Sequence, residues 1–239
     1  MPKRIKNILI YTFLSSSAAS MYQVIFNLYV RDLGMNNTII GNFTSLELWG
    51  SAIIGMLLGI LGDKFGRKKM LLISSFSSSF ILFLRVLFPT ETVLLSLAFF
   101  SGGFFASSQI LLNIFIVDIT DHSNRGKAFG LNFGIMMGSG LFGNTFGGFL
   151  GDLLGYQSTL LIASTIYLAS TIEIIKIQDH HVGHTKTFRE LFDFKLLNPK
   201  EKKIISGFLF STFLVGFGAG LFIHFGNIIF KDLFNMSSS

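Results

Sequence analysis

Residues 59–69 read GILGDKFGRKK, a short charged stretch that separates two long apolar segments of the chain. Gly62 and Gly66 permit a close approach of the backbone, or dihedral angles that other residues resist. Asp63 is placed to cap a helix or to pair with Arg67. The basic residues at the end of the stretch suit anionic lipid headgroups. The stretch therefore predicts a tight turn at a membrane edge, and a basic hairpin without any further role would carry the same charges.

Long apolar segments extend outward from this turn in both directions. Half of the 239 residues are hydrophobic and 13% are charged, a charged share about half that of a soluble protein. A helix needs about 20 mostly apolar residues to cross the hydrocarbon core. Seven segments meet this requirement: 8–30, 39–61, 70–88, 93–117, 128–150, 157–177 and 204–230. The sequence shows no ten-residue alternation typical of membrane β-strands. It predicts an all-α membrane protein and argues against a soluble enzyme, a disordered chain and a nucleic-acid-binding protein.

The polar stretches divide these helices into unequal parts. We expect residues 1–177 to form a six-helix transmembrane bundle, 178–203 a cytoplasmic linker, and 204–239 a seventh helix that begins an incomplete second bundle. The sequence NLYVRDL at 27–33 is similar to NIIFKDL at 227–233. Chance similarity between two apolar helix ends would explain this match. A tandem duplication, as in the parallel halves of some secondary transporters, would also explain it.

The positive charges predict the orientation of the helices. With the N-terminus inside, all 19 Lys and Arg residues lie on the inner side except Arg31, Arg85 and Lys231. Cytoplasmic loops carry an excess of Lys and Arg. We therefore expect a multi-pass protein of the cell membrane with a cytoplasmic N-terminus and the lipid bilayer as its surroundings.

The stretch 59–69 resembles the signature loop of the major facilitator superfamily, both in its pattern and in its position between the second and third spans. The residues that match are Gly59, Leu61, Gly62, Asp63, Lys64, Gly66, Arg67, Lys68 and Lys69. The polar loop from Asp118 to Lys127 also resembles a loop of that family. The resemblance implies a transporter that works by alternating access, with a cavity between two six-helix bundles. It further implies a gating role for the turn, carried by Gly59, Gly62, Asp63, Gly66, Arg67 and Lys68.

The fifth span contains a second stretch that is similar to a family motif. Ser139 to Gly148 resembles the glycine-rich motif of antiporter members, with Asn144 in place of a proline and Ser139 in place of a glycine. Small residues at a spacing of four allow helices to approach closely. We expect Gly143, Asn144, Gly147 and Gly148 to pack against a neighbouring helix. The motif favours an exporter or antiporter.

Polar residues inside the spans are candidates for a substrate cavity. In the first span they follow one helical face, namely Thr12, Ser16, Ser20, Gln23 and Asn27. Such a face must meet protein or water and not lipid, and hydrogen bonds between helices would also satisfy it. The resemblance implies that spans one, four and seven line the cavity. Its candidate residues are Gln23, Asn27, Gln109, Asn113, His224 and Asn227.

Glu47 is the one acidic residue well inside a predicted span. A buried carboxylate is costly unless it is paired or protonated. Three interpretations remain open: an ion pair with Arg85 of the next span, a proton carrier that couples transport, or an acid at the membrane interface.

The sequence therefore predicts a secondary transporter of a small solute, with a coupling ion as a further partner. The alternative is a fragment or half-transporter that needs a second bundle or a second copy of itself. We expect no enzyme activity, because no catalytic dyad lies at a bilayer edge. With no cysteine and no dense carboxylate cluster, we expect neither a metal site nor another cofactor.

Overall fold

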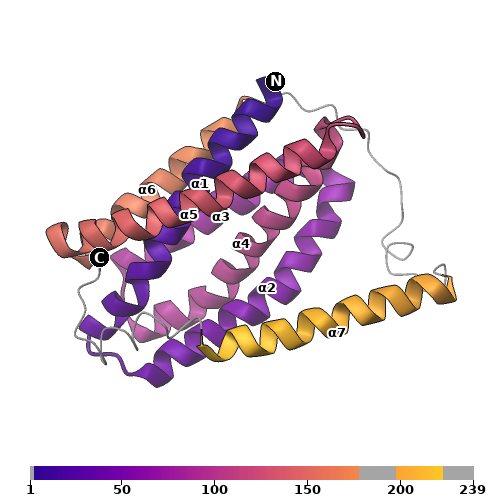
Figure 1. Cartoon of the computed structure of the whole chain (residues 1–239). Coiled ribbons are helices and arrows are strands. Elements are labelled where there is room, and N and C mark those ends of the chain that lie inside the picture. The colour runs from indigo at the N-terminus through magenta and orange to yellow at the C-terminus, as the bar shows by residue number, and fades with distance from the viewer. Residues whose placement is uncertain (1–2, 178–197, 223–239) are drawn as a thin grey trace.

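The computed structural model describes residues 3–177 and 198–222 (Figure 1). The described residues form seven α-helices and no β-strand, which confirms the all-α fold. Their bounds are α1 Lys3–Asp32, α2 Asn37–Phe65, α3 Arg67–Leu87, α4 Glu91–Ile119, α5 Arg125–Leu154, α6 Tyr156–Ile175 and α7 Pro199–Phe222. The predicted spans fall within these helices except at a few terminal residues, and 204–230 extends beyond the described part of the chain.

Five of these helices are long and apolar enough to cross a membrane, namely α1, α2, α3, α4 and α6. The predicted span in α5 does not reach this composition, because the helix is rich in glycine, which adds little hydropathy. Nevertheless α5 runs alongside α1 and α6 in the bundle (Figure 1). Helix α7 is not among the five, and because the predicted span 204–230 extends beyond the described residues, that span remains a prediction.

Helices α1 to α6 pack as one bundle whose neighbours are mostly not consecutive in sequence. α2 packs on α4, α1 packs on α5 and α6, and α3 packs on α4 and α6. Helix α7 lies apart from this bundle (Figure 1), and its described side chains, 202–216, are exposed. The expected linker lies mostly outside the described residues, so the predicted division of the chain at 177 and 203 remains a prediction.

Glycines set the closest helix contacts in the bundle. A Cβ atom on Gly102 of α4 would lie 2.0 Å from the Glu47 carbonyl oxygen of α2. In the same crossing, a Cβ atom on Gly50 of α2 would lie 1.7 Å from the Phe99 carbonyl oxygen of α4. No side chain fits at these distances, so the backbones of α2 and α4 touch directly. This crossing fixes the position of Glu47.

Two apolar clusters form the core, with a layer of hydroxyl groups between them. One cluster contains Ile25 and Val86, and the other contains Leu71 and Leu111. Between them lie buried hydroxyls of α1, α3, α4 and α6, including a hydrogen bond of 2.9 Å between the Tyr11 and Ser75 hydroxyls. Hydrogen bonds of this kind join helices inside a membrane.

The turn between α2 and α3 consists of one residue, Gly66. Its φ is +100°, a conformation that glycine adopts without strain, and its N–H donates to the Gly62 carbonyl oxygen at 3.1 Å. The tight turn expected from the stretch 59–69 is therefore present.

Candidate functional site

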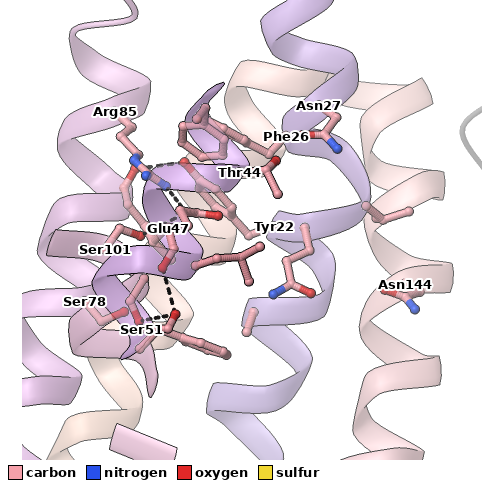
Figure 2. A pocket seen from close by; sticks show the side chains of 18 residues that line it. Tyr22, Phe26, Asn27, Thr44, Glu47, Ser51, Ser78, Arg85, Ser101 and Asn144 are labelled. Atoms are coloured by element: carbon pink, nitrogen blue, oxygen red, sulfur yellow. Dashed lines mark hydrogen bonds and ion pairs between the residues drawn. The ribbon is translucent and has the colours of Figure 1, made fainter. Parts of the chain in front are cut away.

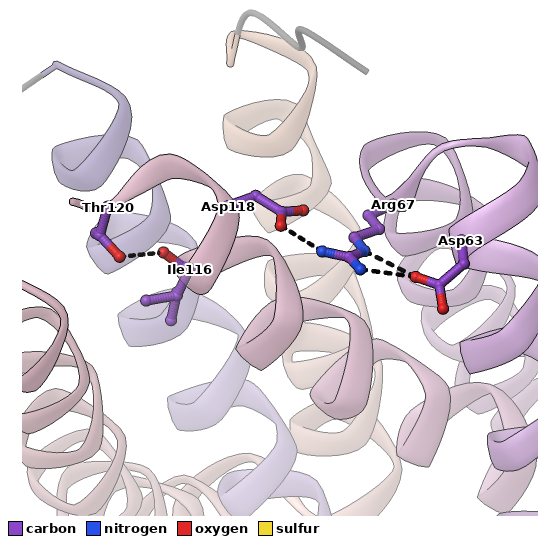
Figure 3. Close-up of polar contacts among 5 residues, drawn as sticks. All are labelled: Asp63, Arg67, Ile116, Asp118 and Thr120. Carbon is purple, nitrogen blue, oxygen red and sulfur yellow. Dashed lines mark hydrogen bonds and ion pairs between the residues drawn. The ribbon is translucent and has the colours of Figure 1, made fainter. Parts of the chain in front are cut away.

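The charged side chains of the turn join three helices at one end of the bundle. Arg67 donates through Nε and Nη2 to Asp63 Oδ1 at 3.0 and 2.8 Å. Its Nη1 also donates to Asp118 at the end of α4, so the guanidinium lies between two carboxylates (Figure 3). A planar guanidinium suits such a double contact, because its donors point outward in fixed directions. The pairing links the α2–α3 turn to α4.

Lys68 extends this connection to a fourth helix. Its Nζ donates to the Ile175 carbonyl oxygen at 3.0 Å, at the C-terminal end of α6. Helix ends carry carbonyl groups without an intrahelical partner, and a lysine there is favourable. Two of the basic residues that were expected to meet lipid headgroups thus contact protein in this state.

The glycines of the turn serve packing as well as the turn itself. A Cβ atom on Gly62 would lie 2.4 Å from Leu111 Cδ2 of α4, so glycine permits the close contact. At Gly59 a Cβ atom would meet Ile110 at an ordinary 3.5 Å. Close packing against α4 therefore requires glycine at position 62, whereas the methyl group of an alanine would fit at position 59.

A buried ion pair lies near the other end of the bundle. Arg85 Nη1 of α3 donates to Glu47 Oε1 of α2 at 3.0 Å, and the Ser101 hydroxyl of α4 donates to the same oxygen at 3.4 Å (Figure 2). The Arg85 side chain is 1% exposed, whereas that of Glu47 is 29% exposed. The contacts of Glu47 therefore agree with the first interpretation, an ion pair with Arg85. Its partial exposure is also compatible with a coupling role.

Aromatic rings surround the guanidinium of this pair. Arg85 Cζ lies 4.4 Å from the ring centroid of Phe43 and 5.5 Å from that of Phe26. A cation over an aromatic face is attracted by the ring quadrupole, more strongly where water is excluded. Together with Glu47, these rings compensate a charge that would otherwise be costly to bury.

The Glu47 carboxylate opens into a cavity of about 410 Å³. Its other polar lining comes from α1, α2, α3, α4 and α5, and includes Gln23, Asn27, Thr44, Ser51, Ser78, Ser101 and Asn144. The aromatic lining is Tyr22, Phe26, Phe43 and Phe105. Figure 2 shows Asn144 on the wall opposite Glu47 and Arg85. The cavity combines one ion pair, several neutral hydrogen-bonding groups and aromatic surface.

A second cavity, of about 530 Å³, adjoins the first between α1, α4 and α5. Its lining includes Ser16, Ser20, Gln23, Gln109, Met136, Met137 and Asn144. Ala19, Gln23, Phe105 and Asn144 line both cavities. Of the polar face expected along the first span, Ser16, Ser20, Gln23 and Asn27 line these two cavities. Thr12 is instead buried and donates to Asn132 Oδ1 of α5 at 2.6 Å, a hydrogen bond between helices.

The expected cavity residues fall into three groups. Gln23 lines both cavities, Asn27 the first and Gln109 the second. Asn113 is exposed and lines neither of these cavities, because it lies one turn further along α4 toward the C-terminal end of that helix. His224 and Asn227 lie outside the described residues.

The expected packing motif of α5 needs one correction. Gly143 and Gly147 do face α1, where added Cβ atoms would lie 2.2 Å from the Ser17 carbonyl oxygen and 2.9 Å from Met21 Cα. Gly148 is buried as well. Asn144 is instead exposed and lines both cavities. One residue along a helix turns the side chain by about 100°, which carries Asn144 off the packed face.

Sequence reasoning missed several residues of the site. Tyr22, Phe26 and Phe43 read as ordinary apolar positions, and Ser101 as one of many membrane serines. Aromatic residues one helical turn from Glu47 and from the polar face of α1 were the available signal. Among the described residues, no group of three or more His, Cys, Asp or Glu side chains could hold a metal ion.

Comparison with known proteins identifies a family and several relatives that match most of the chain. The family described as Major Facilitator Superfamily matches residues 8–239. Multi-drug resistance efflux pump PmrA of Streptococcus pneumoniae is 27% identical over 220 residues, which cover 87% of this chain and 53% of the relative. Multidrug resistance protein MdtG of Klebsiella pneumoniae is 28% identical over 201 residues, 79% of this chain and 48% of the relative.

A third similar protein is Quinolone resistance protein NorA of Staphylococcus aureus, 24% identical over 211 residues, which cover 87% of this chain and 54% of the relative. The chain spans about half the length of these curated relatives.

Proposed function

The chain belongs to the major facilitator superfamily, and from this premise we propose that it forms the solute-binding bundle of an exporter that works by alternating access, in exchange for a coupling ion. It is a membrane transporter protein and not an enzyme. The observation that carries the proposal is the Glu47–Arg85 pair, a buried charge pair that opens into a cavity. The names of the relatives, an efflux pump and two resistance proteins, support export.

In this proposal Glu47 binds the coupling proton. Its carboxylate is partly exposed to the cavity, whereas the side chain of its partner Arg85, which also lines the cavity, is only 1% exposed. Protonation of Glu47 removes the negative charge that balances the guanidinium, while the rings of Phe43 and Phe26 remain beside it. Because a buried unpaired charge is costly, α2 and α3 then favour a different arrangement. Protonation of Glu47 thus shifts the balance between two arrangements of α2 and α3.

The α2–α3 turn acts as the gate at the other end. Arg67 and Lys68 tie the turn to Asp118 of α4 and to the end of α6. Opening that end of a cavity requires these contacts to separate, so their strength sets the balance between the closed and open states. The turn is cytoplasmic, and the protein lies in the cell membrane with its N-terminus inside.

A second candidate follows from the length of the relatives. Parallel halves of these transporters form the binding site together at their interface. The chain spans about half of each relative, and its cavities are bounded by helices of one bundle. In this alternative, the 239-residue chain binds a solute but does not move it without a second bundle or a second copy.

Flux into liposomes separates the two candidates. The purified chain is reconstituted, a pH gradient is imposed, and movement of the fluorescent cation ethidium is recorded. Gradient-dependent flux that Glu47→Gln abolishes and Thr145→Ala preserves supports transport by the chain alone. Ethidium binding without flux supports the second candidate. Ethidium is a suitable probe because it is an aromatic cation and the first cavity holds the Glu47 carboxylate and several aromatic rings. Absence of both binding and flux for ethidium contradicts the proposed solute-binding cavity.

A further inference from the structure

The two adjoining cavities differ in chemistry. The first contains the Glu47–Arg85 pair and several aromatic rings. No ionisable side chain is among the residues that line the second, which presents amides, hydroxyls and the thioethers of Met136 and Met137. Gln23 and Asn144 belong to both linings and lie at the junction.

In the first cavity, a solute meets a carboxylate before it meets a guanidinium. Glu47 is 29% exposed and Arg85 only 1%. Glu47 Oε1 already accepts from Arg85 and Ser101. A carboxylate has further acceptor capacity beyond these two contacts. The aromatic rings of the lining add attraction for a cation. This end of the site therefore suits a basic nitrogen.

In the second cavity, the polar groups are neutral and come from three helices. Gln23 of α1, Gln109 of α4 and Asn144 of α5 each carry an amide, which both donates and accepts hydrogen bonds. The two methionines are flexible and adapt to irregular apolar shapes. Without a charged group, this end would select for an amide or hydroxyl on an otherwise apolar body.

We propose that the two cavities bind one elongated solute, with its basic nitrogen at Glu47 and an uncharged amide or hydroxyl end at Gln109 and Asn144. The inference rests on the proposed solute-binding function and adds a second subsite to it. The neutral subsite depends on the side-chain amides of Gln109 and Asn144, which both line the second cavity.

The test is a binding measurement by titration calorimetry on the full chain in lipid nanodiscs. The probes are phenethylamine and two extended series in which an alkyl spacer on the amine ends either in a carboxamide or in a branched alkyl group of equal size. Asn144→Ala or Gln109→Ala should weaken binding of the carboxamide probe of matching spacer length about three- to tenfold, the effect of one neutral hydrogen bond. The same variants should leave phenethylamine and the alkyl probes unchanged.

Two controls make the result specific. Glu47→Gln should weaken binding of every probe, because all carry the amine. Thr145→Ala should change none, since Thr145 is exposed beside Asn144 on α5 and lines neither cavity.

Equal losses for the carboxamide and alkyl probes, or a stoichiometry of two probes per chain, would overturn the single elongated site. If phenethylamine binds the wild-type chain but neither Asn144→Ala nor Gln109→Ala weakens binding of the carboxamide probe, the second subsite is refuted and the first remains. If no probe binds the wild-type chain, the proposed solute cavity fails together with it.

Discussion

Arg85 shows how a single buried charge is accommodated in an apolar bundle. It is almost fully buried, and Glu47 and the Phe43 ring are its nearest compensating groups. An arginine does not lose its proton under ordinary conditions, so the charge stays whatever happens to its partner. The stability of this region therefore depends on Glu47.

We expect Glu47→Ala to destabilise the chain by about 3–5 kcal/mol, because it leaves the buried Arg85 without its carboxylate. Glu47→Gln should cost less, since the amide oxygen still accepts a hydrogen bond. Thermal unfolding in detergent measures both. Glu91→Gln is the matched control, because Glu91 is exposed at the start of α4. A Glu47→Ala variant as stable as that control would contradict the importance of the pair.

The sequence raised the Glu47–Arg85 pair only as one of three interpretations. A lone acid and a lone base on successive predicted helices are placed to meet, but the sequence does not specify which faces of the helices adjoin. The aromatic rings around Arg85 come from α1 and α2, and their positions depend on the crossing of α2 and α4. The spacing of Phe26 and Phe43 from the polar residues gave a local signal, but it did not specify that both rings would meet Arg85.

At the scale of helices, glycine positions determine which pairs approach closely. The sequence indicated that Gly143 and Gly147 would pack, because their spacing of four places them on one face. It did not single out Gly50 or Gly103, which form the α2–α4 crossing. Gly50 and Gly103 belong to no regular repeat, so only the structure reveals their role.

We expect Gly102→Ala to lower the free energy of unfolding by about 1–3 kcal/mol, the usual cost of overpacking. The new Cβ atom would lie 2.0 Å from the Glu47 carbonyl oxygen, and backbone must move to accept it. Gly130→Ala is the matched control on α5, where nothing lies within 4 Å of the added atom. Because alanine favours a helix over glycine, this control should unfold at the same or a slightly higher temperature. Equal destabilisation by both substitutions would argue against a direct α2–α4 backbone contact.

For the molecule as a whole, the sequence predicted the number and order of the helices well. Each apolar segment overlaps one helix of the described residues, the seventh only as far as Phe222, because a helix satisfies its own backbone hydrogen bonds. The neighbours in the bundle were not predictable, since α2 with α4 and α1 with α5 are separated along the chain. The orientation across the membrane rests on the charge distribution and is open to a direct test.

The chain contains no cysteine, so a single introduced cysteine reports the position of one residue without background. We expect Lys68→Cys in intact cells to resist an impermeant maleimide and to react after the membrane is permeabilised, because the turn after α2 is proposed to be cytoplasmic. Thr92→Cys is the control at the opposite end of the bundle, near the start of α4, where the residue is exposed. It should react in intact cells.

The two positions together make the labelling experiment decisive. An inverted orientation exchanges the two results, which would refute the cytoplasmic gate while leaving the fold intact. Reaction at both positions in intact cells would contradict a membrane crossing by α3, since that helix alone separates the turn from the loop before α4. The proposed gate therefore depends on Lys68 being reachable only from the side that carries most of the positive charge.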